Sequence, residues 1–164
     1  MTDICEKILT TLQGAFGGAF RQYYDGDPVS LPEQCLPCLI VDLNDTHVTQ
    51  GPTGFDRLTH TITVKVALNK KDDYGKSAVQ ATTTKKLRSY SQGQADAGGF
   101  LPQSILGVLR TDDTLRGRIV NQDEQVRYGV VDRFESNSVT AEAHVVVTAT
   151  ELVPARRLYP DGGQ

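Results

Sequence analysis

The stretch LTHTITVKVALNKKDDYGKS, from Leu58 to Ser77, decides the fold because it holds the clearest β-strand of the chain. Its side chains alternate with a period of two residues. One row, apolar except for His60, consists of Leu58, His60, Ile62, Val64, Val66 and Leu68. The intervening row consists of Thr59, Thr61, Thr63 and Lys65. Such alternation is typical of a strand that buries one face and turns the other away from the core. We therefore predict a half-buried strand that ends at Asn69.

The same stretch ends in Gly75-Lys76-Ser77, which matches the last residues of a phosphate-binding loop. The first glycine of such a loop would stand at position 70, which is a lysine, and the adjacent Asp72 and Asp73 would repel a nucleotide's phosphates. We expect no nucleotide at Lys76. The two aspartates are instead expected to cap a following helix, whose inward side comprises Val79, Thr83, Leu87 and Tyr90.

The segments before this strand predict a helix and then a long hairpin. Apolar residues recur at three- and four-residue spacings from Ile4 to Phe16, with Thr2 or Asp3 as the cap and Gly17 as the stop. The proline-containing segment 21–37 is expected to be an extended connection. A strand then begins at Leu39 and leaves the core as it proceeds, and segment 50–57 forms the flexible tip of a hairpin with the strand quoted above.

The second half of the chain predicts a short helix and further strands. The helix is expected over Ser104–Arg110, and strands over Gly117–Asn121, Val126–Phe134 and Val139–Ala149, with Asn137 in the last turn. This order indicates an α+β fold: a single, mostly antiparallel or mixed sheet of four to five strands, with an N-terminal helix and one long plus one short helix packed on it. We expect one domain over residues 1–152 and an extended C-terminal tail over 153–164.

Composition limits the classes of function. A chain of 164 residues with 38% hydrophobic content fits one globular domain. The formal net charge of −3 offers no basic field for gripping nucleic acid, so DNA near this protein is expected to pass by without being held. No apolar run approaches the roughly 20 residues that span a bilayer, and the N-terminus lacks a signal-type apolar segment. We expect synthesis in the cytoplasm and no membrane contact.

The cysteines and histidines predict neither a disulfide framework nor a metal site. Cys5, Cys35 and Cys38 are an odd set, and Cys35-Leu-Pro-Cys38 leads into an apolar run, unlike a thioredoxin-type pair, which follows a strand at a helix N-terminus. The histidines, His47, His60 and His144, are scattered singly, so zinc would lack two ligands. We expect reduced structural thiols, no metal and no cofactor. We interpret His60 as a core or edge residue.

No catalytic motif is present either. The chain lacks the H-E-x-x-H, G-x-S-x-G and G-x-G-x-x-G patterns. The paired aspartates at 72–73 and 112–113 lie where caps and turns are expected, so solvated capping explains them better than acid catalysis or metal binding. We expect a structural protein and not an enzyme.

The order of these elements resembles a known family. An N-terminal helix, a proline-containing lead into a strand, a hairpin tip at GPTGFD, the strand LTHTITVKVALN followed by KKDDYGKS and a helix, and paired strands ending in VVVTATELVPARR are similar to the tail-terminator and tail-completion proteins of long-tailed bacteriophages. The resemblance covers nearly the whole chain and depends on element order and strand pattern, since this family carries no catalytic motif.

The resemblance implies a virion component at the junction of tail and neck, made in the cytoplasm of the bacterial host. Its partners would be further copies of itself in a ring, commonly a hexamer, together with the tail-tube protein and a head-side connector or stopper protein. DNA would pass through the lumen without specific binding. Two segments are available to reach these partners, the tip at 50–57 and the tail at 153–164. The candidate interface residues are Gly51, Pro52, Thr53, Gly54, Phe55, Asp56, Arg57, Arg156, Arg157 and Tyr159.

Two alternatives stay open from the sequence. The nearer is another ring protein of the phage neck, such as a head-tail joining or stopper protein, because the same α+β parts would serve it. The more distant is a small cytosolic enzyme or ligand-binding domain. A deep pocket that contains His47, His60 or His144 together with a carboxylate would favour that second alternative.

Overall fold

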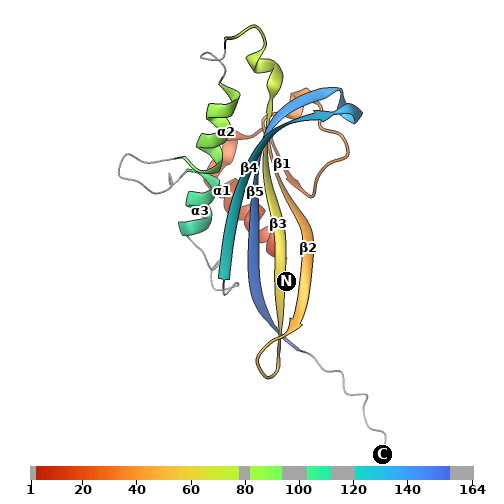
Figure 1. Ribbon diagram of the computed structural model, residues 1–164, viewed down its shortest axis with the longest axis vertical. Coiled ribbons are helices and arrows are strands. Elements are labelled where there is room, and N and C mark those ends of the chain that lie inside the picture. Colours follow the sequence, from red (N-terminus) through yellow and green to blue (C-terminus); the bar gives the residue numbers. More distant parts are fainter. Residues whose placement is uncertain (1–2, 78–81, 94–102, 112–120, 156–164) are drawn as a thin grey trace, which may run out of the picture.

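The computed structural model describes residues 3–77, 82–93, 103–111 and 121–155. Three α-helices and five strands run through them (Figure 1), in the order α1 Ile4–Phe16, β1 Gln22–Asp25, β2 Cys38–Gln50, β3 Phe55–Asn69, α2 Thr83–Ser91, α3 Ile105–Thr111, β4 Asn121–Arg133 and β5 Ser138–Pro154. This architecture confirms the predicted α+β fold class. The continuation of β5 to Pro154 carries regular structure past position 152, and the division into a domain and a tail stays a prediction.

The strands form one mixed sheet in the order β1-β2-β3-β5-β4. β1 pairs with β2 in parallel, and every other pairing is antiparallel. The central pair, β3 with β5, runs without interruption from Phe55 opposite Pro154 to Asn69 opposite Thr140. The predicted hairpin of β2 with β3 is confirmed, and so is the end of β3 at Asn69.

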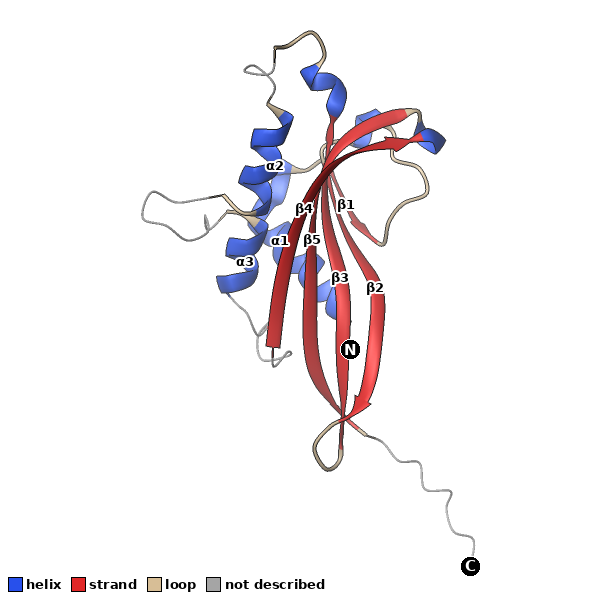
Figure 2. Ribbon diagram, in the orientation of Figure 1, coloured by secondary structure: helices blue, strands red, loops and turns tan. Residues whose placement is uncertain are grey.

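All three helices contribute to a core on one face of the sheet (Figure 2). The apolar row of β3 lies in this core, where Ile62, Val64 and Val66 are fully buried. The facing row of β5 is equally buried and consists of Ala141, Ala143, Val145, Val147 and Ala149. Each of these residues is two positions from the next, as the pleat requires. The alternation in the sequence therefore identified the buried face of both central strands.

The first helix forms as its sequence predicts. The Asp3 side chain accepts a hydrogen bond of 2.8 Å from the backbone N–H of Glu6, which satisfies one of the free donors of the first turn. Ile4, Ile8 and Leu12 bury one side of the helix. Gly17 ends it with a φ of 51°, a left-handed conformation that glycine adopts without strain.

The helix after the quoted stretch is capped from a distance. Residues 70–73 form a short 3-10 turn, and the Asp73 carboxylate accepts hydrogen bonds from the backbone N–H groups of Thr82 at 2.9 Å and Thr83 at 3.3 Å, at the start of α2. Capping by Asp73 is therefore confirmed. The prediction that Asp72 also caps the helix was wrong, because its side chain is exposed and lines a pocket. Thr83 and Leu87 face inward as predicted, and Val79 lies outside the described residues.

Two predicted segments differ from the structure. Segment 21–37 is not only a connection, because Gln22–Asp25 forms the parallel edge strand β1 and 33–35 forms a 3-10 turn. All the prolines of the segment follow β1, so they do not interrupt its pairing. The strand expected over 126–134 begins earlier, at Asn121, and residues 117–120 lie outside the described part. Asn137 is confirmed in the turn between β4 and β5, with a left-handed φ of 51°.

The face of the sheet that the helices leave uncovered carries a second, smaller core. Leu31 and Leu36 from the segment after β1 pack on Cys38, Ile40 and Ala67 of the sheet. Ser138 fastens this segment to β5 by donating a hydrogen bond of 2.8 Å to the Leu31 carbonyl. Most other side chains on this face are polar, with Val131 and Val146 among the exceptions, and the face carries the charges described below.

Candidate interaction surfaces

The hairpin tip projects from one end of the molecule (Figure 1). Its turn is closed by two backbone hydrogen bonds, from Gly51 N–H to the Phe55 carbonyl at 3.0 Å and from Phe55 N–H to the Pro52 carbonyl at 2.9 Å. Gly54 has a φ of 84°, which favours glycine, and a Cβ at Gly51 would lie 3.1 Å from the Phe55 carbonyl oxygen. These two glycines allow the chain to reverse in so short a distance.

The structure places one of the two predicted contact segments fully and the other only at its beginning. Residues 51–57 lie together in the tip and the first residues of β3, with Phe55 43% exposed. The C-terminal strand ends beside them, because Pro154 lies opposite Phe55 and the Ala155 N–H donates to the Gly54 carbonyl at 2.9 Å. Arg156, Arg157 and Tyr159 lie outside the described residues. The tip and the start of the tail therefore share one end of the molecule.

The base of this projecting arm, which we define as 43–61 and 148–155, is held by a buried polar cluster. His60 Nε2 lies 2.8 Å from a Glu151 carboxylate oxygen, and His60 Nδ1 lies 3.0 Å from the Thr46 hydroxyl. His60 and Glu151 are each 6% exposed. The cluster thus links β2, β3 and β5 by side chains in addition to the backbone ladder. The interpretation of His60 as a satisfied core residue is confirmed.

A second polar cluster lies on the helix-free face at the opposite end of the sheet. Arg133 makes two contacts to Glu142, from Nε at 3.1 Å and from Nη2 at 3.0 Å, and a third to Asp27 at 3.2 Å. Lys65 Nζ lies 2.7 Å from a carboxylate oxygen of Asp27 and 3.5 Å from a carboxylate oxygen of Asp42. Burial raises the pKa of Glu142, but hydrogen bonds from His144, Arg133 and Thr140 outweigh it and hold that pKa at about 2. The cations of this cluster are therefore neutralised locally.

Both sides of the sheet present strand edges without a partner among the described strands. β1 covers β2 only from Cys38 to Val41, so the edge of β2 from Leu43 to Gln50 is open. On the other side, β4 pairs with β5 alone along its whole length. Open edges expose backbone donors and acceptors that can pair with another chain. Neither open segment contains a proline or a lysine, two residue types that discourage such pairing.

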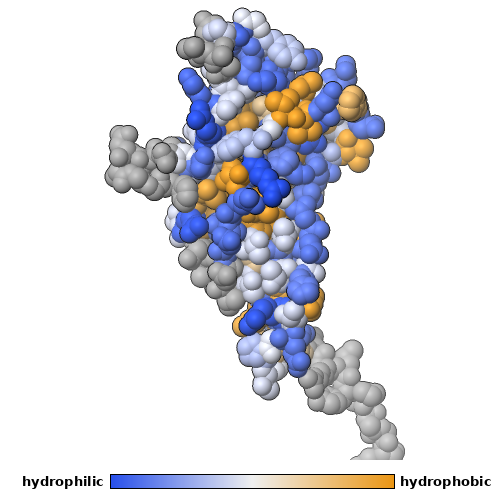
Figure 3. Space-filling model, in the orientation of Figure 1, coloured by the Kyte–Doolittle hydropathy of each residue, from blue (hydrophilic) through white to orange (hydrophobic). Residues whose placement is uncertain are grey.

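Exposed apolar side chains accompany these edges. Leu43 is 48% and Val48 is 59% exposed on β2, and Tyr128 is 42% and Val130 is 61% exposed on β4. Figure 3 shows apolar surface at the end of the molecule where β4 and β5 join, a region in which Phe134 is 83% exposed. Sequence analysis missed the edge residues. The pattern that could have indicated them is the occurrence of isolated apolar residues within the otherwise polar segments 43–50 and 121–130.

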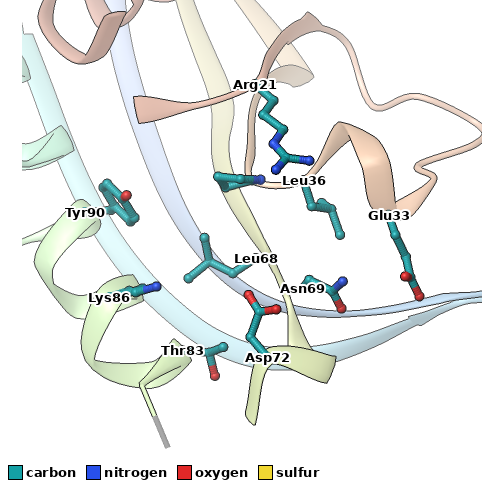
Figure 4. A pocket seen from close by; sticks show the side chains of 10 residues that line it. Arg21, Glu33, Leu36, Leu68, Asn69, Asp72, Thr83, Lys86 and Tyr90 are labelled. Atoms are coloured by element: carbon teal, nitrogen blue, oxygen red, sulfur yellow. The ribbon is translucent and has the colours of Figure 1, made fainter. Parts of the chain in front are cut away.

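A small polar pocket opens between the end of β3, the start of α2 and segment 21–37 (Figure 4). Its volume is about 210 Å³, and its charged residues are Arg21, Lys86, Glu33 and Asp72. Leu36 and Leu68 supply apolar walls. None of His47, His60 and His144 lines it. The combination of histidine and carboxylate that would favour an enzyme or ligand-binding domain is therefore not found in this pocket.

The thiols are separated by their environments. Cys5 and Cys38 are buried and Cys35 is partly exposed. Burial raises the pKa of Cys5 to about 11 and that of Cys38 to about 12, which suppresses the reactive thiolate. Over the described ranges, no three His, Cys, Asp or Glu side chains gather as metal ligands would. None of the described helices is long and apolar enough to cross a membrane.

Comparison with other proteins finds likeness among solved structures alone. No protein-family model and no curated protein matches the chain. Among solved structures, the chain is similar to a chain of the structure described as "Virion of native gene transfer agent (GTA) particle". The sequence identity is 16% and the TM-score is 0.42, and the alignment covers 92% of this chain and 95% of the other.

Proposed function

We propose that this chain is a structural virion protein that assembles as a ring on the end of a phage tail tube, stops tube growth and joins the tail to the head-side connector. The observation that carries the proposal is the projecting arm. Its tip is built from a glycine-dependent turn, it ends beside the start of the C-terminal tail, and it lies beyond the part of the sheet that the helices cover. The tip of such an arm adds little to the core and is suited to contacting another subunit.

The two open edges support assembly into a ring. They belong to different strands, β2 and β4, at opposite sides of the sheet. A contact that joins two different surfaces is heterologous, and repetition of it closes into a ring when the rotation between subunits allows. We propose six subunits, as the resemblance to tail terminators implies.

The charge distribution supports a channel through which DNA slides. The chain has a formal net charge of −3, and the Arg133 and Lys65 cations of the helix-free face are paired with carboxylates. The same face carries Thr59, Thr61, Thr148 and Thr150 along the arm. The exposed Arg57 and Arg127 also belong to this face. With Arg133 and Lys65 paired and hydroxyl groups along the arm, a lumen formed by this face would retain a phosphate backbone only weakly. We propose that the protein is not an enzyme and that it needs no cofactor.

The neighbouring role, a head-tail joining or stopper protein, would use the same fold and the same ring. The two roles differ in what the arm touches. For a terminator, we propose that the arm contacts the tail tube or an adjacent subunit. Electron microscopy of the assembled particle, with antibody fragments bound to the tip, separates the two roles by placing the tip on the tail-tube side or on the head side.

The proposal predicts different failures for the arm and the core. Replacing Gly51–Phe55 by Asn-Gly shortens the tip and leaves a two-residue turn between Gln50 and Asp56, the last pair of the β2–β3 ladder, so the chain should melt like the wild type but form rings or cap tails poorly. Val64 is fully buried, and Val64→Asp should give unfolded or insoluble protein, since an unpaired buried charge costs several kcal/mol. Melting temperature and particle mass by light scattering are the two measurements.

Normal melting together with lost assembly of the tip variant supports the arm as the contact surface. Rings and tail lengths that stay unchanged in the tip variant would make the tip an ordinary surface loop.

A further inference from the structure

We infer that the subunits of the assembly join by strand pairing, with the open edge of β2 in one copy lying antiparallel to β4 of the next copy. The inference rests on the proposed ring and specifies its subunit contact. The partner is a second copy of this chain.

The strand directions permit this pairing. β2 is antiparallel to β3, β3 to β5 and β5 to β4, so β2 and β4 of one copy run in opposite directions. Rotation about an axis roughly along the strands leaves these directions unchanged. In a ring, β4 of one subunit and β2 of its neighbour therefore meet as an antiparallel pair, the geometry in which backbone hydrogen bonds are perpendicular to the strands.

The apolar residues of the two edges, exposed except for the half-buried Val126, lie on the same side of the sheet. Leu43 lies opposite Ile62 and Val48 opposite Leu58, on the side that carries the helices. Val126, Tyr128 and Val130 lie opposite the buried residues Val145, Ala143 and Ala141, again on the helix side. When the sheets of two copies continue each other, these apolar side chains face one another across the new ladder.

Their spacing defines a register. Leu43 and Val48 are five residues apart in sequence, but the β2 strand has an irregularity next to Asn44 that takes up one residue. The two residues therefore stand four ladder positions apart, like their partners Ile62 and Leu58 on β3. Val130 and Val126 are also four positions apart. The register that pairs both apolar ends places Leu43 beside Val130, Thr46 beside Tyr128 and Val48 beside Val126.

The opposite side of the same register is compatible in charge. It places His47 beside Arg127, Asp45 beside Gly129 and Thr49 beside Gln125. Asp45 then lies diagonal to Arg127, within reach of an ion pair. Asp45, His47 and Arg127 are all exposed in the single chain, so each is available to a neighbour.

Charge placed on either edge tests the surface. Val48→Lys and Val130→Lys should each convert assembled protein to monomer, because lysine on an edge discourages strand pairing. Val29→Lys is the matched control, since Val29 is 86% exposed in the segment after β1 and belongs to neither edge strand, and it should leave assembly unchanged. Equal melting temperatures of all three variants would show that the fold is intact. Assembly that survives both edge variants would overturn the inference.

Cysteine cross-linking tests the register. In a Cys35→Ser background, His47→Cys with Arg127→Cys should give a reducible ladder of covalent multimers under mild oxidation. His47→Cys with Asp123→Cys should give none, because four residues along β4 displace the second thiol by roughly 13 Å, beyond the reach of a disulfide. Rings seen by electron microscopy without the predicted ladder would overturn the strand pairing and leave the ring intact. Wild-type protein that forms no ring, alone or on tail tubes, would overturn the proposed function as well.

Discussion

Arg133 and Glu142 form a two-pronged ion pair across the β4–β5 hairpin, with N···O distances of 3.1 and 3.0 Å and a Glu142 side chain that is 1% exposed. The pair holds together the end of the sheet opposite the arm. Arg133 also forms an ion pair with Asp27 of the segment after β1, and this contact holds the segment against the hairpin.

This pair predicts acid sensitivity. The pKa of Glu142 is about 2 in the folded chain against an ordinary value of 4.5, so its contribution to stability is present above about pH 4.5 and is lost as the pH falls toward 2. The contribution is on the order of 3 kcal/mol. Glu142→Gln should lower the melting temperature at pH 7 and flatten its dependence on pH in this window. Glu135→Gln, at an exposed position in the adjoining turn, is the control, and identical acid profiles for all three proteins would contradict the account.

The cap of α2 predicts a difference between adjacent aspartates. Asp73 accepts hydrogen bonds from Thr82 and Thr83, including one from the Thr83 hydroxyl, and these bonds with that from Lys70 lower its pKa. Asp73→Ala should therefore lower the melting temperature and speed amide exchange in the first turn of α2. Asp72→Ala removes an exposed carboxylate with no such contacts and should change neither. Equal effects of the two substitutions would show that the cap contributes nothing particular.

The thiols should react in two classes. Denatured protein without reductant should show three thiols per chain and no stoichiometric zinc. In the folded protein at pH 8, only the partly exposed Cys35 should react readily, because Cys5 and Cys38 are buried with raised pKa values. Fewer than three thiols after denaturation, or bound zinc at one per chain, would overturn the expectation of free cysteines.

Lys76 should have no role in nucleotide binding. It lies in an exposed turn after the 3-10 segment, where its N–H donates to the Asp73 carbonyl at 3.1 Å. Lys76→Ala should leave melting and assembly unchanged. Calorimetric titration with ATP provides the check, and heat of binding in the wild type that disappears in the variant would contradict the interpretation.

The sequence predicted the parts of the fold that depend on local pattern. The helix from Ile4, the rows of β3 and β5 and the turn at Asn137 all follow from spacing, caps or left-handed backbone within a few residues. The parallel strand β1 was missed because its partner lies across a proline-rich connection, and four residues carry no periodic signal.

The polar clusters depend on contacts between residues distant in sequence. Glu142 stands at a position that alternation assigns to the side away from the core, yet it is buried beneath Arg133 on the helix-free face. No residue near Glu142 in the sequence indicates that Asp27 belongs to the same cluster, because Asp27 lies in a segment more than a hundred residues earlier. The open edges were likewise invisible, because an edge is defined by which strand fails to find a neighbour.

The central proposal, that this chain ends tail-tube growth as a ring, is tested most directly by the length of tubes polymerised from the tail-tube protein that it is proposed to cap. With increasing amounts of the chain present, the account predicts progressively shorter tubes in electron micrographs, each with a ring at one end, and no shortening with the Val64→Asp protein. Tubes whose lengths do not change, and whose ends carry no ring at any ratio of the two proteins, would contradict it.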